Sequence, residues 1–412
     1  MTLAFKCRGL SAQYSVYLNG DMPRLAVITP VFPNKTDPDR GIYCYYISKA
    51  LQKWAEVEVY NLISTYPKSR LWRPRRRAHH HLETGGDSDE RHPGVKAHFI
   101  EYPAFPVLTR PFNSGTCARL LRPYMATARP DALLAFWVYP EGFGAVRVGE
   151  ELGIPVILRA MGSDLRQIPD PLSRIGVKQS LRRATAVITV SEDLRQRAIA
   201  LGASPEKIHR IVNGCDASVF RFAERAPARA ALGIVPEAQV VLYVGRLEAA
   251  KGVRELLDAT ARLLPSHPRV QLVCIGGGVM EGEARARSNG PDLAGHVSLL
   301  GRRSQPDVAR WLAACDLLCL PSHSEGCPNV ILEAFSCGRP VVACDVGGVP
   351  ELMDPNCGLL LPPRDAGALA AALSEALQRK WDETFIAARL GRSWDHVAQE
   401  IFEIYRALPK SS

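Results

Sequence analysis

The sequence contains no apolar run long enough to cross a bilayer. A spanning helix needs about 20 consecutive apolar residues, whereas the longest stretch, around Ala132 to Tyr139, has the length of one strand. The residues before Met22 also lack the apolar centre of a secretory signal peptide, because polar side chains interrupt them throughout. The sequence therefore predicts a protein that is not integral to the membrane and stays in the cytoplasm.

Common metal and cofactor signatures are missing too. None of the 11 cysteines forms the paired Cys-x-x-Cys spacing of a zinc site, so we expect them to be reduced, small and buried. Gly276 to Gly278 follow a strand-like run, but Glu281 stands where a dinucleotide fingerprint has its last glycine, which argues against a dehydrogenase. The Asp-x-Asp sequences at 37–39 and 87–89 lie in polar loops and are interpreted as turns. We expect no metal and no cofactor.

Positive charge is concentrated in the first half of the chain. Residues 1–215 hold 30 Lys and Arg against 19 Asp and Glu, whereas residues 216–412 hold 21 against 23. The densest basic cluster, at 73–77, lacks the interleaved aromatics that stack on bases, so we expect no nucleic-acid partner. A basic half is instead expected to be drawn to an anionic membrane surface, as a peripheral protein on the cytoplasmic face. For the cluster itself, a solvated loop remains the alternative.

Apolar runs of strand length alternate with helix-length segments along both halves. In the first half the runs are 25–29, 133–138, 156–158 and 186–190. In the second half they are 240–244, 270–275, 297–300, 317–320 and 341–343. Such alternation is typical of parallel sheets with crossover helices. We predict an α/β protein of two doubly wound, Rossmann-like domains whose strand ends face a common cleft.

The domain boundaries are placed where this alternation starts and stops. We predict an N-terminal extension at 1–21, an N-terminal domain at 22–215, a linker at 216–237 and a C-terminal domain at 238–394. The first strand follows Met22 directly, so a second hypothesis is that Met22 is the true start. The polar stretch from Pro67 to His98 is expected to be a mobile surface loop.

The sharpest motif lies at 324–333, after the run that ends at Leu320. Pro328 suits the first turn of a helix. The free backbone N–H groups of Asn329 and Val330 would then point outward at the positive end of that helix, which favours an anion.

Two carboxylates bracket this helix start. Glu325 precedes the helix, where it can accept hydrogen bonds from a polyhydroxyl ligand, and Glu333 lies further inside. As alternatives, Glu325 caps the helix and Glu333 is a solvated helix residue. A second cluster favours the ligand interpretation, because Gly245 and Arg246 end the first strand of the same domain and Lys251 follows. Two cations at this edge can stabilise a departing diphosphate without a metal.

Together these motifs resemble retaining glycosyltransferases of family 4, which have the two-domain GT-B fold. The resemblance is carried by Val244-Gly245-Arg246, Lys251-Gly252, Gly276-Gly277-Gly278, the Glu-x7-Glu pair, Cys337-Gly338-Arg339-Pro340 and Gly347-Gly348-Val349-Pro350-Glu351. It extends to Ser191-Glu192 and Asn213-Gly214-Cys215-Asp216, and so covers nearly the whole chain from Leu25 onward. Chains with Trp137-Val138-Tyr139-Pro140-Glu141-Gly142 and Gly162-Ser163-Asp164 are similar to enzymes of cell-surface polysaccharide assembly, such as teichuronic-acid-type pathways.

The resemblance implies a role for each donor-side residue. Arg246 and Lys251 would hold the donor diphosphate beside Gly245, Glu325 would bind donor sugar hydroxyls, and Glu333 would bind the ribose. Asn329 and Val330 would offer backbone donors. It also implies a helix at 395–412 that packs back on the N-terminal domain.

The implied activity is that of a retaining, metal-independent hexosyltransferase. It would move a sugar from a nucleotide diphosphate sugar, with uridine diphosphate favoured, to a glycan or lipid-linked glycan acceptor. A sugar-nucleotide epimerase or a phosphorylase of the same fold is the alternative.

The acceptor side departs from the family pattern, because Met161 and Phe136 stand where a basic residue is frequent. We still expect Gly41 and Asp164 to line the acceptor side. Their alternatives are a turn glycine and a helix N-cap.

Overall fold

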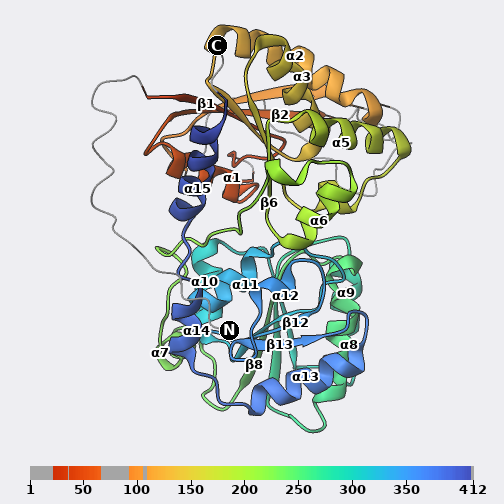
Figure 1. Ribbon diagram of the computed structural model, residues 1–412. Helices are drawn as coiled ribbons and strands as arrows, with labels where there is room; N and C mark the ends of the chain where they lie inside the picture. The colour runs from red at the N-terminus through yellow and green to blue at the C-terminus, as the bar shows by residue number, and fades with distance from the viewer. Residues whose placement is uncertain (1–21, 36, 66–91, 105–108, 410–412) are drawn as a thin grey trace.

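Two parallel sheets organise the protein, one in each half of the chain (Figure 1). The structure is a computed structural model that describes residues 22–35, 37–65, 92–104 and 109–409. In each sheet the first strand lies inside and later strands are added on both sides, which is the doubly wound arrangement. The predicted α/β fold class is confirmed.

The seven-stranded sheet belongs to the N-terminal half. In spatial order its strands are β3 (Lys96–Pro103), β2 (Glu56–Thr65), β1 (Arg24–Thr29), β4 (Ala132–Phe136), β5 (Val156–Ala160), β6 (Ala186–Thr189) and β7 (Ile208–Arg210). The helices around it are α1 (Ile42–Leu51), α2 (Asn113–Ala128), α3 (Phe143–Leu152), α4 (Ser163–Arg166), α5 (Pro171–Arg183) and α6 (Glu192–Ala200). Three short helical turns join them: η1 (Arg110–Phe112), η2 (Val138–Gly142) and η3 (Pro205–Lys207).

The six-stranded sheet belongs to the C-terminal half. Its strands are β10 (Val297–Gly301), β9 (Val270–Ile275), β8 (Gln239–Val244), β11 (Leu317–Leu320), β12 (Val341–Cys344) and β13 (Gly358–Leu361). Around it lie η4 (Ala249–Lys251), α8 (Val253–Leu263), α9 (Glu281–Ser288), α10 (Gln305–Ala314), α11 (Asn329–Ser336), α12 (Val349–Leu352), α13 (Ala366–Gln378) and α14 (Glu383–Leu390).

Burial on both faces explains why the central strands are apolar without alternation. Every residue of β4, β11 and β12 is buried, as expected of parallel strands covered by helices on both sides. Burying one Leu or Val side chain contributes about 1.5–3 kcal/mol. These strands therefore form rigid supports for the loops at their carboxyl ends.

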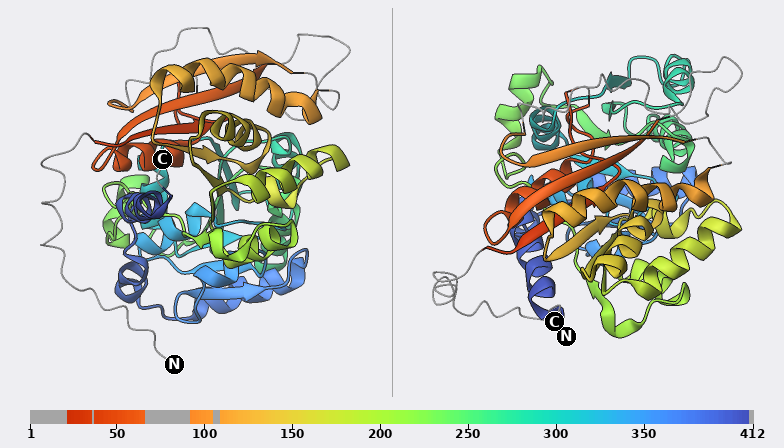
Figure 2. Two further views of the ribbon diagram at one scale, coloured as in Figure 1. Left: turned by 45° about the horizontal axis from the view of Figure 1, so that its top comes forward. Right: turned by 90° about the horizontal axis from the view of Figure 1, so that it is seen from above.

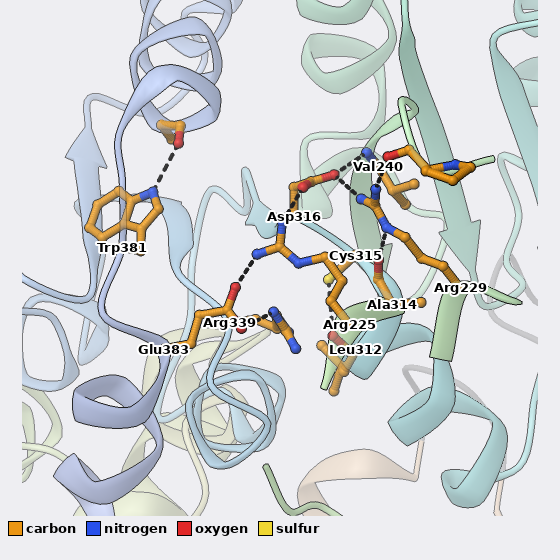
Figure 3. Close-up of polar contacts among 12 residues, drawn as sticks. Arg225, Arg229, Val240, Leu312, Ala314, Cys315, Asp316, Arg339, Trp381 and Glu383 are labelled. Carbon is orange, nitrogen blue, oxygen red and sulfur yellow. Dashed lines mark hydrogen bonds and ion pairs between the residues drawn. The ribbon is translucent and has the colours of Figure 1, made fainter. Parts of the chain in front are cut away.

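The segment 216–237 contains helix α7 (Arg225–Leu232), which is tied to the C-terminal sheet (Figure 3). Arg229 donates to the carbonyl oxygens of Ala314 and Pro236 at 3.0 and 2.8 Å, and its guanidinium lies 2.5 Å from Asp316. Arg225 pairs with Asp316 and with Glu383 of α14. The connection between the two sheets is thus anchored on the C-terminal one.

The last helix, α15 (Trp394–Ala407), packs against α1 of the N-terminal domain (Figure 2). Its Trp394 stacks on Tyr46, and its Phe402 stacks on Trp54, with 6.0 Å between ring centroids in both pairs. The chain therefore crosses from the first domain to the second and back.

Four strands were absent from the sequence prediction: β2, β3, β7 and β13. Of these, β3 overlaps the stretch predicted as a loop from Pro67 to His98, so that prediction is wrong for Lys96 to His98. β3 alternates polar and apolar residues at the sheet edge, and its pattern is weak. The predicted extension at 1–21, the basic cluster at 73–77 and the Asp-x-Asp sequence at 87–89 lie outside the described residues.

Within the described residues, no helix combines the length and the apolar character that crossing a membrane would require. The ten cysteines of these residues are free and buried, as predicted. Burial raises the pKa of their thiols, for example of Cys274 to about 12. They are unreactive core residues.

Candidate functional site

The loop after β8 is shaped by close backbone contact with the loop after β9. Gly245 N donates to Ile275 O at 2.9 Å, and a Cβ on Gly276 would lie 1.9 Å from Gly245 O. Gly276 also has φ +138, which side chains rarely tolerate. The glycines therefore let two strand ends meet, and this fixes the loop that carries Arg246.

Arg246 lies at the surface of this loop. Tyr243 holds its backbone, because the hydroxyl donates to Arg246 O at 2.7 Å. The guanidinium is 65% exposed and lies 2.8 Å from Glu248 Oε1. Arg246 is thus in the predicted loop, but its side chain pairs with Glu248 and not with the residues around Lys251.

Lys251 and Glu325 form a partly buried ion pair. Lys251 ends η4, and its Nζ lies 2.6 Å from Glu325 Oε1, with exposures of 19% and 11% for the two side chains. His323 N donates to Ala250 O at 2.9 Å, which joins the two loops. Gly252 follows with φ +69, and a Cβ there would lie 2.0 Å from Pro321 O. The loops after β8 and β11 therefore meet at the carboxyl edge of the sheet.

Helix α11 begins beside this pair, at the edge of the C-terminal domain that faces the other domain (Figure 1). The sequence predicts Pro328 in the first turn of this helix. In the structure Pro328 lies just before that turn, as the N-cap residue. Among the described residues, nothing accepts a hydrogen bond from the backbone N–H groups of Asn329 and Val330, as is usual in a first helical turn. Both groups remain available to a ligand.

Glu333 lies one turn further along α11, and its carboxylate has no charged partner among the described residues. Burial raises the pKa of its carboxyl to about 7. Its charge also raises the pKa of Tyr46, after the larger effects of burial and Asp216. Glu333 therefore lies within electrostatic reach of α1 and is not the solvated helix residue of the alternative interpretation.

The acceptor-side candidates both have structural contacts. Gly41 precedes α1 with φ +64, and a Cβ there would lie 2.6 Å from Val31 O, so it is a glycine required by its turn. Asp164 accepts hydrogen bonds from Gly162 N at 2.8 Å, Met161 N at 3.1 Å and Val138 N at 3.1 Å. Burial raises the pKa of Asp164 against these hydrogen bonds. It joins the ends of β4 and β5 and is not an N-cap of α4.

A chain of hydrogen bonds through one arginine and two asparagines connects the N-terminal core to the start of α11, and the sequence did not reveal it. Arg159 is fully buried on β5, and its Nη2 donates to Asn213 Oδ1 at 2.8 Å. Asn213 Nδ2 in turn donates to Asn329 Oδ1 at 2.8 Å. An arginine inside an apolar strand pattern was the signal that could have found it.

Two further residues cross between the domains. Arg166 of α4 forms an ion pair with Asp193 and lies against Gly347 of the C-terminal domain. Burial lowers the pKa of Arg166, while the negative charges of Asp193 and Glu325 raise it. In the opposite direction, Glu351 of α12 accepts hydrogen bonds from Glu192 N at 2.8 Å and Asp193 N at 3.1 Å. The segment after β12 is therefore held against the N-terminal domain through Gly347 and Glu351.

Comparison with known families gives a match for each domain. Residues 41–214 match the model described as a glycosyl transferase 4-like domain, and residues 238–379 match glycosyl transferases group 1. A D-inositol 3-phosphate glycosyltransferase of Jonesia denitrificans is 32% identical over 256 residues, which cover 58% of this chain and 60% of that protein. A putative teichuronic acid biosynthesis glycosyltransferase, TuaC of Bacillus subtilis, is 33% identical over 249 residues, covering 60% and 61%. Each match thus spans less than two thirds of the relative.

Solved structures share the architecture at low identity. Anabaena Alr3699/HepE in complex with UDP and glucose superposes with a TM-score of 0.71 at 21% identity, over 94% of this chain and 100% of that one. Sucrose-phosphate synthase of Thermosynechococcus elongatus gives 0.70 at 21% identity, over 93% and 98%. The predicted GT-B fold is confirmed.

Proposed function

The chain belongs to the group 1 glycosyl transferases with a glycosyl transferase 4-like N-terminal domain, and from this premise we propose that it transfers a sugar from a nucleoside diphosphate to an acceptor. The observation that carries the proposal is the Lys251–Glu325 pair beside the free N–H groups of α11. A cation, a carboxylate and a positive helix end at one place suit a sugar diphosphate, which is anionic at one end and polyhydroxylic at the other.

Each group has a distinct task in this proposal. Lys251 has three N–H donors, so it can hold Glu325 with one and a phosphate oxygen with another. At about 4 Å and an effective dielectric near 20, one cation favours a phosphate charge by roughly 4 kcal/mol before desolvation. Glu325 accepts hydrogen bonds from sugar hydroxyls. Arg246 adds positive charge by turning away from Glu248.

The ribose is assigned to Glu333. Its carboxyl has no hydrogen-bond donor among the described residues, and the two ribose hydroxyls would supply two. The backbone N–H groups of Asn329 and Val330, with Gly245 opposite, are assigned to the diphosphate. Gly41 and Asp164 are assigned to the acceptor side through the loops they fix.

The reaction is proposed to retain the anomeric configuration. The bond between the anomeric carbon and the phosphate oxygen breaks while the acceptor oxygen bonds to the same face, and the leaving phosphate takes the acceptor proton. The charge that develops on the diphosphate is stabilised by Lys251, Arg246 and the start of α11, so electrostatic preorganisation is the main contribution. No metal is assigned a role.

The donor is proposed to be a uridine diphosphate sugar, because the Anabaena protein with the same fold is bound to UDP-glucose. The acceptor is proposed to be a glycan or lipid-linked glycan of cell-surface polysaccharide synthesis, supported by the likeness to TuaC. A cytoplasmic site of action at the membrane face follows from such an acceptor.

The test is to incubate the protein with UDP-glucose and candidate acceptors and to measure UDP release together with acceptor mass. UDP release that rises with acceptor, with an added hexose on that acceptor, is expected. Conversion of the sugar nucleotide without acceptor would identify an epimerase instead, and release that needs inorganic phosphate would identify a phosphorylase.

A further inference from the structure

Three large apolar side chains are exposed on one part of the N-terminal domain. Phe112 of η1 is 70% exposed, and Leu172 and Ile175 of α5 are 56% and 51% exposed. Leu172 and Ile175 are three residues apart and so share one face of the helix. Isolated exposed apolar residues are common, but a group of large ones marks a contact site.

The three side chains belong to one surface because η1 packs against α5. Tyr139 of η2 joins the two elements: its hydroxyl donates to Pro111 O at 2.8 Å, and its ring lies where a Cβ on Gly176 would come within 2.4 Å. Helices α2, α3 and α5 lie together on this side of the domain (Figure 1). We call Phe112, Leu172, Ile175 and the cations around them the η1–α5 surface.

This surface is strongly basic. From Arg110 to Ala128 and from Pro171 to Arg183 there is no Asp or Glu, whereas seven residues are Lys or Arg. Two of the seven are neutralised by α3, because Arg122 pairs with Glu151 and Arg183 pairs with Glu150. Among the described residues, the other five have no ion pair: Arg110, Arg119, Arg174, Lys178 and Arg182. Asp170 precedes α5 and caps it by accepting a hydrogen bond from Ser173 N at 2.7 Å, and its carboxylate also interacts with the charge of Arg110.

We propose that the η1–α5 surface docks on an anionic lipid bilayer. Phe112, Leu172 and Ile175 would enter the interface, and the unpaired cations would meet lipid phosphates. Apolar groups that share helices with unpaired cations match a bilayer, which is apolar inside and negatively charged at its surface. A second copy of this chain would bring the same cations face to face, so it does not complement the surface.

The position of the surface gives the docking a use. Tyr139, which joins η1 to α5, follows β4 within η2, and Val138 of the same turn is held by Asp164. Docking would therefore place the acceptor-side loops next to the bilayer, where a lipid-linked acceptor is found. Only this use rests on the proposed transfer reaction, since bilayer binding is measured without any substrate.

The experiment is co-sedimentation of the full chain with vesicles of phosphatidylcholine alone or mixed with phosphatidylglycerol. The first variant combines Phe112→Ser, Leu172→Ser and Ile175→Ser, and the second combines Arg174→Gln with Lys178→Gln. A matched control replaces two exposed apolar residues of the other domain, Val279→Ser with Phe385→Ser.

We expect the wild type and the control to sediment only with the anionic vesicles. The apolar variant should bind about tenfold more weakly at any salt concentration, and the charge variant should lose binding as salt rises. Equal binding by the apolar variant and the wild type would overturn the proposal. So would binding lost only on neutralising Arg73 and Arg75 to Arg77, or a dimer that dissociates in the apolar variant.

Discussion

Lys251 Nζ lies 2.6 Å from Glu325 Oε1, and both side chains are largely shielded from water. Such a pair is costly to break from one side, because the remaining charge stays partly buried without a counter-charge. It also positions both groups at the start of α11, where they can act on one ligand. The pair is the centre of the proposed donor site.

Removing either member is expected to slow transfer strongly. Lys251→Ala and Glu325→Gln should each lower kcat by about 10²–10³-fold, as the loss of one group that stabilises a developing charge does. Arg254→Ala is the matched control, because Arg254 is a cation close in sequence that is 60% exposed and pairs with Glu283. Initial rates of UDP release at saturating acceptor give the comparison.

The two substitutions should not be additive. Since the residues act as a unit, the double variant is expected to be about as slow as the slower single variant. Losses that multiply in the double variant, or a Glu325→Gln enzyme at the wild-type rate, would refute the joint role.

Gly252 offers a comparison that separates crowding from backbone strain. Gly252 and Gly233 have φ of +69 and +67, but a Cβ on Gly252 would lie 2.0 Å from Pro321 O, whereas Gly233 has nothing within 4 Å. Gly233→Ala should cost about 1 kcal/mol of unfolding free energy through its φ alone. Gly252→Ala should cost roughly 2 kcal/mol more and also lower kcat, because Lys251 is displaced. Urea unfolding measures the unfolding free energy of both variants. Equal losses in the two variants would contradict the crowding of Gly252 against Pro321.

Stability is expected to fall as pH rises from about 4.5 to about 7, because burial raises the pKa of Glu333 to about 7. In this range the folded carboxyl keeps a proton that the unfolded chain has released, so raising the pH favours unfolding. Glu333→Gln should remove this loss of stability, which over the whole pH range amounts to on the order of 3 kcal/mol. UDP affinity of the wild type should weaken below about pH 7, since a protonated carboxyl accepts fewer hydrogen bonds.

Glu141 is the matched control for Glu333. It is 5% exposed, and burial likewise raises its pKa to about 7. Glu141→Gln should flatten the stability profile as Glu333→Gln does, but it should leave UDP affinity unchanged. An equal loss of affinity in both variants, by calorimetric titration, would remove Glu333 from the site.

The buried link through Asn213 predicts a stability effect. Asn213→Ala removes the acceptor of the fully buried Arg159 and frees Asn329. We expect a loss of about 2 kcal/mol in unfolding free energy. Asn289→Ala at an exposed helix end should change it by less than about 0.5 kcal/mol. An Asn213→Ala protein as stable as the wild type would show that the link has no energetic role.

The central strands could be predicted from the sequence, because burial on both faces selects apolar residues. The strands β4, β11 and β12 are continuous apolar runs because helices cover both faces, and this pattern identified them. The edge strand β3 mixes polar and apolar residues and is partly exposed, and the edge strand β13 is apolar but only four residues long, so neither gives a strong strand pattern. Edge position, which depends on the whole sheet, cannot be read from local pattern.

The donor side was more predictable than its supports. Gly245, Lys251, Glu325 and Asn329 stand in short motifs at strand ends, where chemistry restricts residue type. Arg159, Arg166 and Asn213 act across the domains and are separated in sequence from what they touch. Asp164 and Gly41 were expected on the acceptor side, and the contacts that the structure gives them are structural ones with neighbouring loops.

The central claim is that Lys251, Glu333 and the start of α11 hold a nucleoside diphosphate. The measurement is the shift in Tm on adding UDP, GDP or ADP, with magnesium or with a chelator, for the wild type, Lys251→Ala, Glu333→Ala and the Arg254→Ala control. We predict that UDP raises the Tm of the wild type and the control equally with and without chelator, and raises it little in the other two variants. A wild type that no nucleotide stabilises, or a UDP shift that persists in Lys251→Ala and Glu333→Ala, would contradict the claim.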